Sequence, residues 1–185
     1  VSKIKNKDGV PFIGDGIGYS SIDGELNTVM NKHTLFRQGK ESKLTNNLNE
    51  LCRSRKNYTS DLFFKKTDSI WQALTELNNE FIQQYPEYSW AINNEAASEF
   101  YGMLCTSYWG DTMPQNLLIK INNHQPYFTS NDGVLFYNYL NTYLNVRVPS
   151  IENNLNKIDS IYPSPKADVL KTFLLAKGKN SFALT

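Results

Sequence analysis

Apolar residues recur at helical spacing through most of this chain. In the middle of the sequence two such stripes follow one another, the first entered from Thr67 or Asp68 and stopped by Pro86, the second closed by Gly110. Residues three or four positions apart lie on one face of a helix, so each stripe predicts an amphipathic helix. The segment between the stripes is short, which favours antiparallel packing. The sequence therefore predicts an αα-hairpin core over about residues 68–109.

Shorter stripes of the same kind predict further helices on both sides of this core. They begin at or near Leu26, Leu44, Asp132, Ile151 and Ser164. Several follow an aspartate or a serine, which caps a helix N-terminus well, and the last ends before a glycine. The chain is therefore expected to be dominated by helices.

The pattern changes to alternation after Pro114. Leu117, Ile119 and Ile121 stand at every second position, and a polar turn then leads to residues 127–129. Alternating apolar residues on both sides of a turn are typical of a β-hairpin. We therefore predict a small antiparallel sheet around residues 117–129 and an α+β, helix-dominated fold class.

Composition fits one folded domain over residues 1–185. The chain has a mass of 21.2 kDa, is 40% apolar and 20% charged, and has a mean hydropathy of -0.48. These values exclude collagen, coiled coils and disordered chains. No apolar run approaches the roughly 20 residues of a spanning helix, so membrane insertion is not expected. The chain begins at Val1 and not at a methionine, which leaves secretion or injection open as its location.

Charge is segregated along the chain although the net charge is only +1. Residues 1–66 carry an excess of basic side chains, whereas residues 67–119 hold no Lys or Arg. The acids of this second segment are Asp68, Glu76, Glu80, Glu87, Glu95, Glu99 and Asp111. They either pair with the basic segments or form a face that steers a charged partner. We expect the αα-hairpin to turn this negative face outward.

One loop could carry catalytic side chains. Asp15, Asp23 and Glu25 lie close together in the sequence, and Arg37 follows. Two carboxylates whose pKa values are separated by burial can act as acid and base, so this set is the candidate for a hydrolase or transferase of the effector or toxin kind. The glycines of residues 14–18 do not have the spacing of a phosphate-binding motif.

The two cysteines lie on apolar stripes. Cys52 and Cys105 are therefore predicted to be buried free thiols, with a single disulfide between them as the alternative. His124 is the one histidine that could pair with Cys105 in a nucleophilic dyad. The chain has two histidines and two cysteines at spacings that fit no zinc motif, so no metal and no cofactor are expected.

Large aromatic residues near the ends of the two central helices are candidate contacts for a partner. Amphipathic rings in such places often anchor protein interfaces. The candidates are Tyr85, Tyr88, Trp90 and Trp109. They favour a non-catalytic domain that binds another protein.

The basic segment of residues 37–66 supports a further alternative, a nucleic-acid-binding domain. Arg53, Arg55 and Lys56 lie close to aromatic residues there, and such a mixture can hold phosphates and stack bases. The pI of 7.8 is low for such a protein. We therefore expect a protein partner before a nucleic acid.

Overall fold

The computed structural model describes residues 4–5, 11–12, 24–40, 42–127, 131–145 and 150–182. Within these ranges the chain is almost entirely helical. Its helices are α1 (Gly24–Lys40), α2 (Ser42–Arg53), α3 (Ser60–Ile82), α4 (Ser89–Ser107), α5 (Gln115–Asn123), α6 (Asn131–Asn145), α7 (Ile151–Ile161) and α8 (Lys166–Phe182), with short 3-10 turns η1 (Arg55–Asn57) and η2 (Pro86–Tyr88). The two-residue strands β1 (Ile4–Lys5) and β2 (Pro11–Phe12) pair antiparallel.

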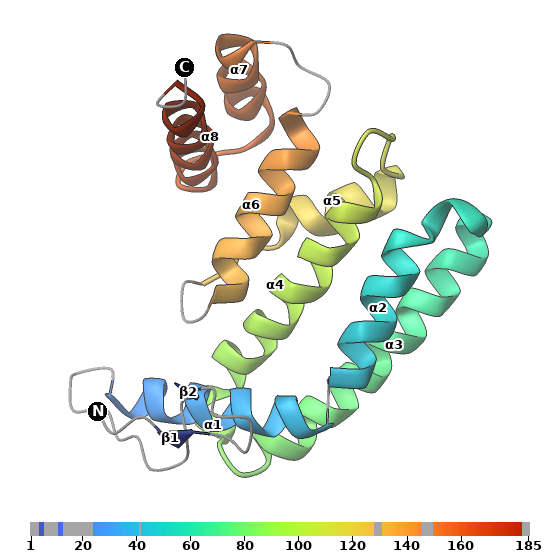
Figure 1. The fold of residues 1–185 in the computed structure, drawn as a ribbon, viewed down its shortest axis with the longest axis vertical. Helices are drawn as coiled ribbons and strands as arrows, with labels where there is room; N and C mark the ends of the chain where they lie inside the picture. The colour runs from blue at the N-terminus through green and yellow to red at the C-terminus, as the bar shows by residue number, and fades with distance from the viewer. Residues whose placement is uncertain are drawn as a thin grey trace.

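Helix α4 lies at the centre of the arrangement (Figure 1). α6 runs along it in the same direction, and the antiparallel pair α2 and α3 packs against its other side. α1 crosses the end where α4 begins, while α7 and α8 pack together near the opposite end of α6. Among the described residues, none of the helices is long and apolar enough to cross a membrane.

The predicted sheet around residues 117–129 is wrong, and with it the α+β fold class, because this region of the fold is helical. Residues 115–123 form α5. Leu117 and Ile121 are buried, four residues apart on one helix face, whereas Ile119 between them is 49% exposed. A short run of apolar residues fits both the two-residue repeat of a strand and the 3.6-residue repeat of a helix, and here the helical repeat applies. Residues 128–129 lie outside the described residues.

The two helices predicted around residues 68–109 form and pack on each other, but they are not a self-contained core. The rings of Trp71 on α3 and Phe100 on α4 lie 4.8 Å apart. α4 makes its most extensive contact with α6 instead. A Cβ atom on Gly102 would lie 3.2 Å from the ring of Tyr139 and 3.4 Å from the backbone of Phe136. The missing side chain at Gly102 therefore lets α4 and α6 approach closely.

Lys166 joins the end of the chain to α5. It is the first residue of α8, is only 4% exposed, and donates hydrogen bonds from Nζ to the carbonyl oxygens of Ile121 (3.1 Å), Asn122 (2.8 Å) and His124 (2.6 Å). The last carbonyls of a helix have no partner within the helix, so Lys166 caps α5. Burial lowers the pKa of this ammonium group to about 8.

Candidate functional site

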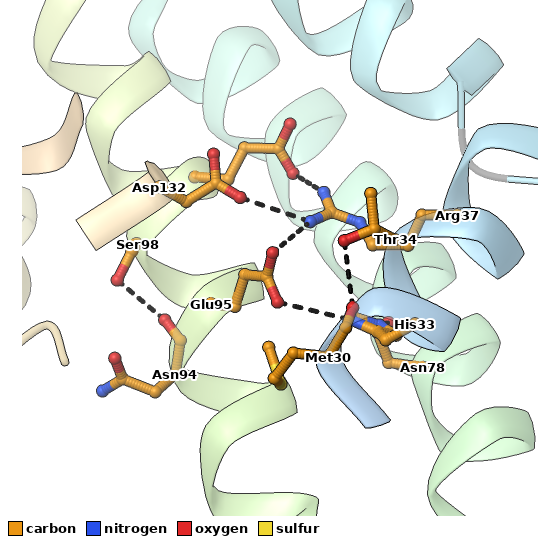
Figure 2. Close-up of polar contacts among 10 residues, drawn as sticks. Met30, His33, Thr34, Arg37, Asn78, Asn94, Glu95, Ser98 and Asp132 are labelled. Carbon is orange, nitrogen blue, oxygen red and sulfur yellow. Dashed lines mark hydrogen bonds and ion pairs between the residues drawn. The ribbon is translucent and has the colours of Figure 1, made fainter. Parts of the chain in front are cut away.

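A cluster of charged side chains lies where α1 meets α4 and α6 (Figure 2). Arg37 from α1 lies at its centre. Its Nη1 is 3.5 Å from Oε1 of Glu95 and 3.4 Å from Oδ2 of Asp132, and its Nη2 contacts Glu99. All four side chains are largely withdrawn from water, Glu95 most of all at 4% exposed. One guanidinium thus holds three carboxylates from two helices.

His33 adds a second basic group to this cluster. Its side chain is fully buried one helical turn before Arg37. Nδ1 lies 3.3 Å from Oε2 of Glu95, and Nε2 lies 2.8 Å from Oδ1 of Asn78 on α3. Both partner atoms are acceptors, so whichever ring nitrogen carries a proton can donate a hydrogen bond to its partner. The cluster therefore links α1 to α3, α4 and α6.

Asp132 is a carboxyl of the cluster with a raised pKa. Burial, and then the negative charges of Glu99 and Glu95, raise its pKa to about 7 against the opposing effect of Arg37. A carboxyl that exchanges its proton near neutral pH can serve in acid–base catalysis. Here, however, the guanidinium of Arg37 lies among the three carboxylates, and no residue of the cluster lines either groove described below. We interpret the cluster as the set of contacts that fastens α1 to α4 and α6.

The expectation that the hairpin carboxylates face outward is wrong for Glu95 and Glu99. They point toward α1, whose basic groups neutralise them. Other acids of the same segment also meet the basic part of the chain: Lys40 Nζ lies 2.7 Å from Glu80 Oε2, and Arg55 pairs with Asp111. Much of the charge segregation in the sequence is therefore cancelled by internal ion pairs.

The predicted catalytic set is not brought together by the described residues. Asp15 and Asp23 lie outside them. Glu25 is exposed in the first turn of α1, where desolvation, followed by the hydrogen bond and charge of Glu25, raises the pKa of Tyr88. Arg37 lies three turns further along the same helix, inside the buried cluster. Among the described residues, Arg37 pairs with Glu95, Glu99 and Asp132 and not with Glu25.

The pairing of Arg37 with α4 left a signal in the sequence that pattern reasoning missed. His33 and Arg37 are four residues apart, and so are Glu95 and Glu99. Residues at that spacing share a helix face, so the two helices present matching pairs of opposite charge. The contribution of Asp132 could not be found in this way, because it depends on how α6 packs.

The dyad of Cys105 and His124 does not form. Nε2 of His124 lies 2.9 Å from Oγ of Ser98, and that hydroxyl donates its proton to the carbonyl oxygen of Asn94 (2.8 Å). Nε2 must therefore carry a proton and donate to Oγ. Burial, followed by the charge of Lys166, lowers the pKa of His124 to about 4, so the ring is neutral. Ser98, His124 and Asn94 form a structural network.

The two cysteines are buried free thiols, as the sequence predicts. Burial raises the pKa of Cys52 to about 12 and also raises that of Cys105. Because the thiolate is the reactive form, we expect neither thiol to react with Ellman's reagent in the folded protein, whereas both react in urea. A Ser69→Cys variant, with its new thiol on the exposed side of α3, should be modified at once. Rapid modification of the folded wild type would contradict this prediction.

A groove of about 670 Å³ lies between α3, α4 and α5. We call it the aromatic groove. Its apolar lining consists of Phe64, Trp71, Phe100, Tyr101, Leu104 and Leu117. The rings of Trp71 and Tyr101 are half-buried and nearly parallel, with an interplanar angle of 26° and 6.3 Å between centroids. The two stacked rings, which we call the aromatic wall, both line the groove, and its volume suits a peptide segment or a small ligand.

Charged side chains of both signs surround the aromatic groove. Asp61, Lys65 and Asp68 come from α3, and Lys120 comes from α5. All four are exposed, and among the described residues none of them is in an ion pair. This differs from Arg37 and Arg55, whose charges are matched within the chain. The rim of the aromatic groove therefore carries charge that is free to meet a partner.

A second groove of about 620 Å³ lies on the other side of α3. Its lining includes Tyr58, Leu62 and Ile70, and it shares Lys65 and Ser69 with the aromatic groove. Leu62 is 44% exposed. The first half of α3 thus stands as a ridge between two hollows.

The predicted aromatic contacts are only partly exposed. Trp90 and Trp109 are 48% and 42% exposed, whereas Tyr85 and Tyr88 are half-buried. Trp90 lies edge-on against Tyr127, with 5.4 Å between ring centroids. These rings lie outside the lining of both grooves. Trp71 and Tyr101, which the sequence analysis does not single out, line the aromatic groove together with residues of α5.

The predicted basic residues are divided between the surface and internal pairs. Arg53 and Lys56 are exposed. Arg55 is held against Asp111, the carbonyl oxygen of Ser107 (2.8 Å) and the ring of Tyr108, whose centroid lies 4.5 Å away. Lys56 Nζ also lies 3.8 Å from Oδ2 of Asp111, so part of the positive charge of this segment is matched within the chain.

Comparisons with known proteins give no relative for this chain: no known protein family, curated protein or solved structure matches it. In the part of the chain that the structure describes, His, Cys, Asp and Glu side chains form no group of three or more that could hold a metal ion. The function has to be inferred from the geometry and charge of the chain itself.

Proposed function

We propose that this chain is a protein-binding domain, and that a peptide segment of its partner occupies the aromatic groove. The observation that carries the proposal is the combination of an aromatic wall with rim charges that lack partners within the described chain. A partner segment would cover the half-exposed rings of Trp71 and Tyr101, and it would supply counter-charges to the rim. Aromatic anchors in a hollow with a polar rim are typical of protein-recognition sites.

The charge of the rim favours a polypeptide over a nucleic acid. Two lysines and two aspartates surround the aromatic groove, so its formal charge is zero. Groove binding of single-stranded nucleic acid depends on a clearly positive channel beside the stacking rings. A polypeptide carries both signs of charge and matches a balanced rim. Part of the positive charge of residues 37–66 is also matched within the chain, because ion pairs with acidic side chains are formed by Arg37, Lys40 and Arg55.

A catalytic role receives less support than binding. Asp132, whose pKa is raised to about 7, belongs to the α1 cluster and does not line the aromatic groove. The predicted aromatic contacts Trp90 and Trp109 remain a competing binding surface. The experiment below separates that surface from the groove.

Selection of binders from a displayed random-peptide library tests the proposal. The full chain serves as bait, and the selected peptides are then measured against variants by fluorescence anisotropy. We expect Trp71→Leu and Lys120→Glu each to weaken binding by about tenfold or more, as loss of a central contact does. Lys120 is exposed, so its replacement tests the groove without disturbing the core.

Matched variants at the exposed tryptophans are the control. Trp90→Leu and Trp109→Leu should leave the affinity of the selected peptides unchanged. Thermal unfolding shows whether each variant is folded, which matters for Trp71 because it packs on Phe100. If the selected peptides depend on Trp90 or Trp109 and not on Trp71 or Lys120, the partner binds elsewhere and the proposal is wrong.

A further inference from the structure

Resting on the proposed function, we infer that the aromatic groove recognises an arginine side chain of the partner. Its guanidinium lies over the wall of Trp71 and Tyr101 and pairs with the carboxylate of Asp68. The three residues come from two helices and line one hollow.

The geometry places a carboxylate beside the aromatic wall. Asp68 and Trp71 are three residues apart on α3, so they are neighbours on one helix face. Asp68 on α3 and Tyr101 on α4 line the same groove, and burial, followed by the charge of Asp68, raises the pKa of the Tyr101 phenol. Asp68 is exposed and forms no ion pair among the described residues. A negative charge thus stands unmatched at the edge of two π surfaces.

The nearby lysines do not supply the missing positive charge. Lys65 stands four residues after Asp61 and three before Asp68, so on the helix surface it is flanked by both carboxylates. The α3 side of the groove therefore keeps a formal charge of −1. Lys120 belongs to α5, on the other wall, and no acid occurs in that helix. The groove thus carries a net negative charge on α3, the helix of Trp71, and a positive charge on α5.

Arginine fits this site better than lysine. Its guanidinium is planar, stacks on aromatic faces, and donates two hydrogen bonds side by side to a carboxylate. A cation over an aromatic face is attracted by the ring quadrupole, most strongly by that of tryptophan. The ammonium group of lysine is compact and more strongly hydrated, so it gains less from the wall.

Titration of the full chain with N-acetyl-arginine methylamide, followed by the indole N–H signals in NMR spectra, tests the inference. The chain has three tryptophans, and the variant Trp71→Phe identifies the signal of Trp71. We expect a saturable shift of this signal with a dissociation constant of the order of millimolar. The neutral isostere, N-acetyl-citrulline methylamide, should bind about tenfold more weakly, and Asp68→Asn should weaken the arginine derivative by about fivefold.

Glu76→Gln is the matched control. It removes one carboxylate from the exposed surface of α3, two turns beyond Asp68 and outside the groove lining, and it should leave the affinity unchanged. Equal binding of citrulline, or no shift of Trp71 with the arginine derivative, overturns the inference. So does tighter binding of N-acetyl-glutamate methylamide that depends on Lys120.

This result is separate from that of the peptide selection. If selected peptides need Trp71 and Lys120 but contain no arginine, the groove binds protein and only the arginine inference is wrong. If no selected peptide depends on the groove, the proposed function itself is wrong.

Discussion

Replacing Arg37 with methionine should lower the free energy of unfolding by about 3–5 kcal/mol at pH 8, because removing one partner leaves buried charges uncompensated. Methionine keeps the length of the aliphatic stem, so the loss reports mainly on the guanidinium. Glu95, Glu99 and Asp132 would then face one another across α4 and α6. Urea unfolding followed by circular dichroism at several pH values measures the effect.

The cost of Arg37→Met should depend on pH because Asp132 titrates near neutral pH. The pKa of Asp132 is raised from 3.8 to about 7, so the folded protein holds a proton that the unfolded chain releases. The contribution of Asp132 to the free energy of unfolding therefore falls as the pH rises from 3.8 to about 7, and it is constant above about 7. Without Arg37 its pKa rises further. The cost of Arg37→Met should thus be smaller at pH 5, where the carboxyl is protonated, than at pH 8.

Lys40→Met, one turn further along α1, is the matched control. It breaks an ion pair with Glu80 whose two side chains are more than half exposed, and such pairs contribute about 0–1 kcal/mol. A loss for Arg37→Met that equals this small value, or one that is the same at pH 5 and pH 8, would show that the cluster does not fasten α1.

Phe136→Ala should cost about 3–5 kcal/mol of unfolding free energy, the range for removing a large buried ring. Phe136 is fully buried on α6, at the place where Gly102 brings α4 close. Its ring lies edge-on against His124 with 5.0 Å between centroids, and Nζ of Lys166 lies 5.5 Å from its centre. The same urea experiment measures the loss.

An independent readout is available at His124. Loss of the Phe136 ring admits water, so the pKa of His124, followed by NMR, should move from about 4 toward its ordinary value of 6.5. The control is Val134→Ala, on the same helix at a position 37% exposed, which should change stability by no more than about 0.5 kcal/mol. A Phe136→Ala variant as stable as this control would mean that α4 and α6 are not the centre of the core.

Hydrophobic spacing predicted most of the helices, and it failed where the apolar run was short. From Leu117 to Ile121 the alternation satisfies the strand period and the helix period equally. Only the pattern of burial, with Ile119 outside and its neighbours two positions away inside, separates them. That pattern depends on which elements lie against the segment, which a single sequence does not contain.

The candidate sites depended still more on packing. Asp68, Trp71 and Tyr101 are ordinary helical residues in sequence, and they border a groove because α5 lies beside α3 and α4. Arg37 was a predicted site residue, but its partners come from helices more than 50 residues away. Opposite charges at equal spacing were visible in both helices. That these charges pair could be predicted only with the knowledge that α1 crosses the beginning of α4.

The ammonium group of Lys166 has a consequence for the whole molecule. α8 cannot leave its place without uncovering the final carbonyls of α5, and α5 supplies Leu117 and Lys120 to the aromatic groove. Local opening at the end of the chain is therefore transmitted to the far wall of the groove. α8 therefore supports α5 through Lys166, and we expect the rigidity of the aromatic groove to depend on how firmly α8 is held.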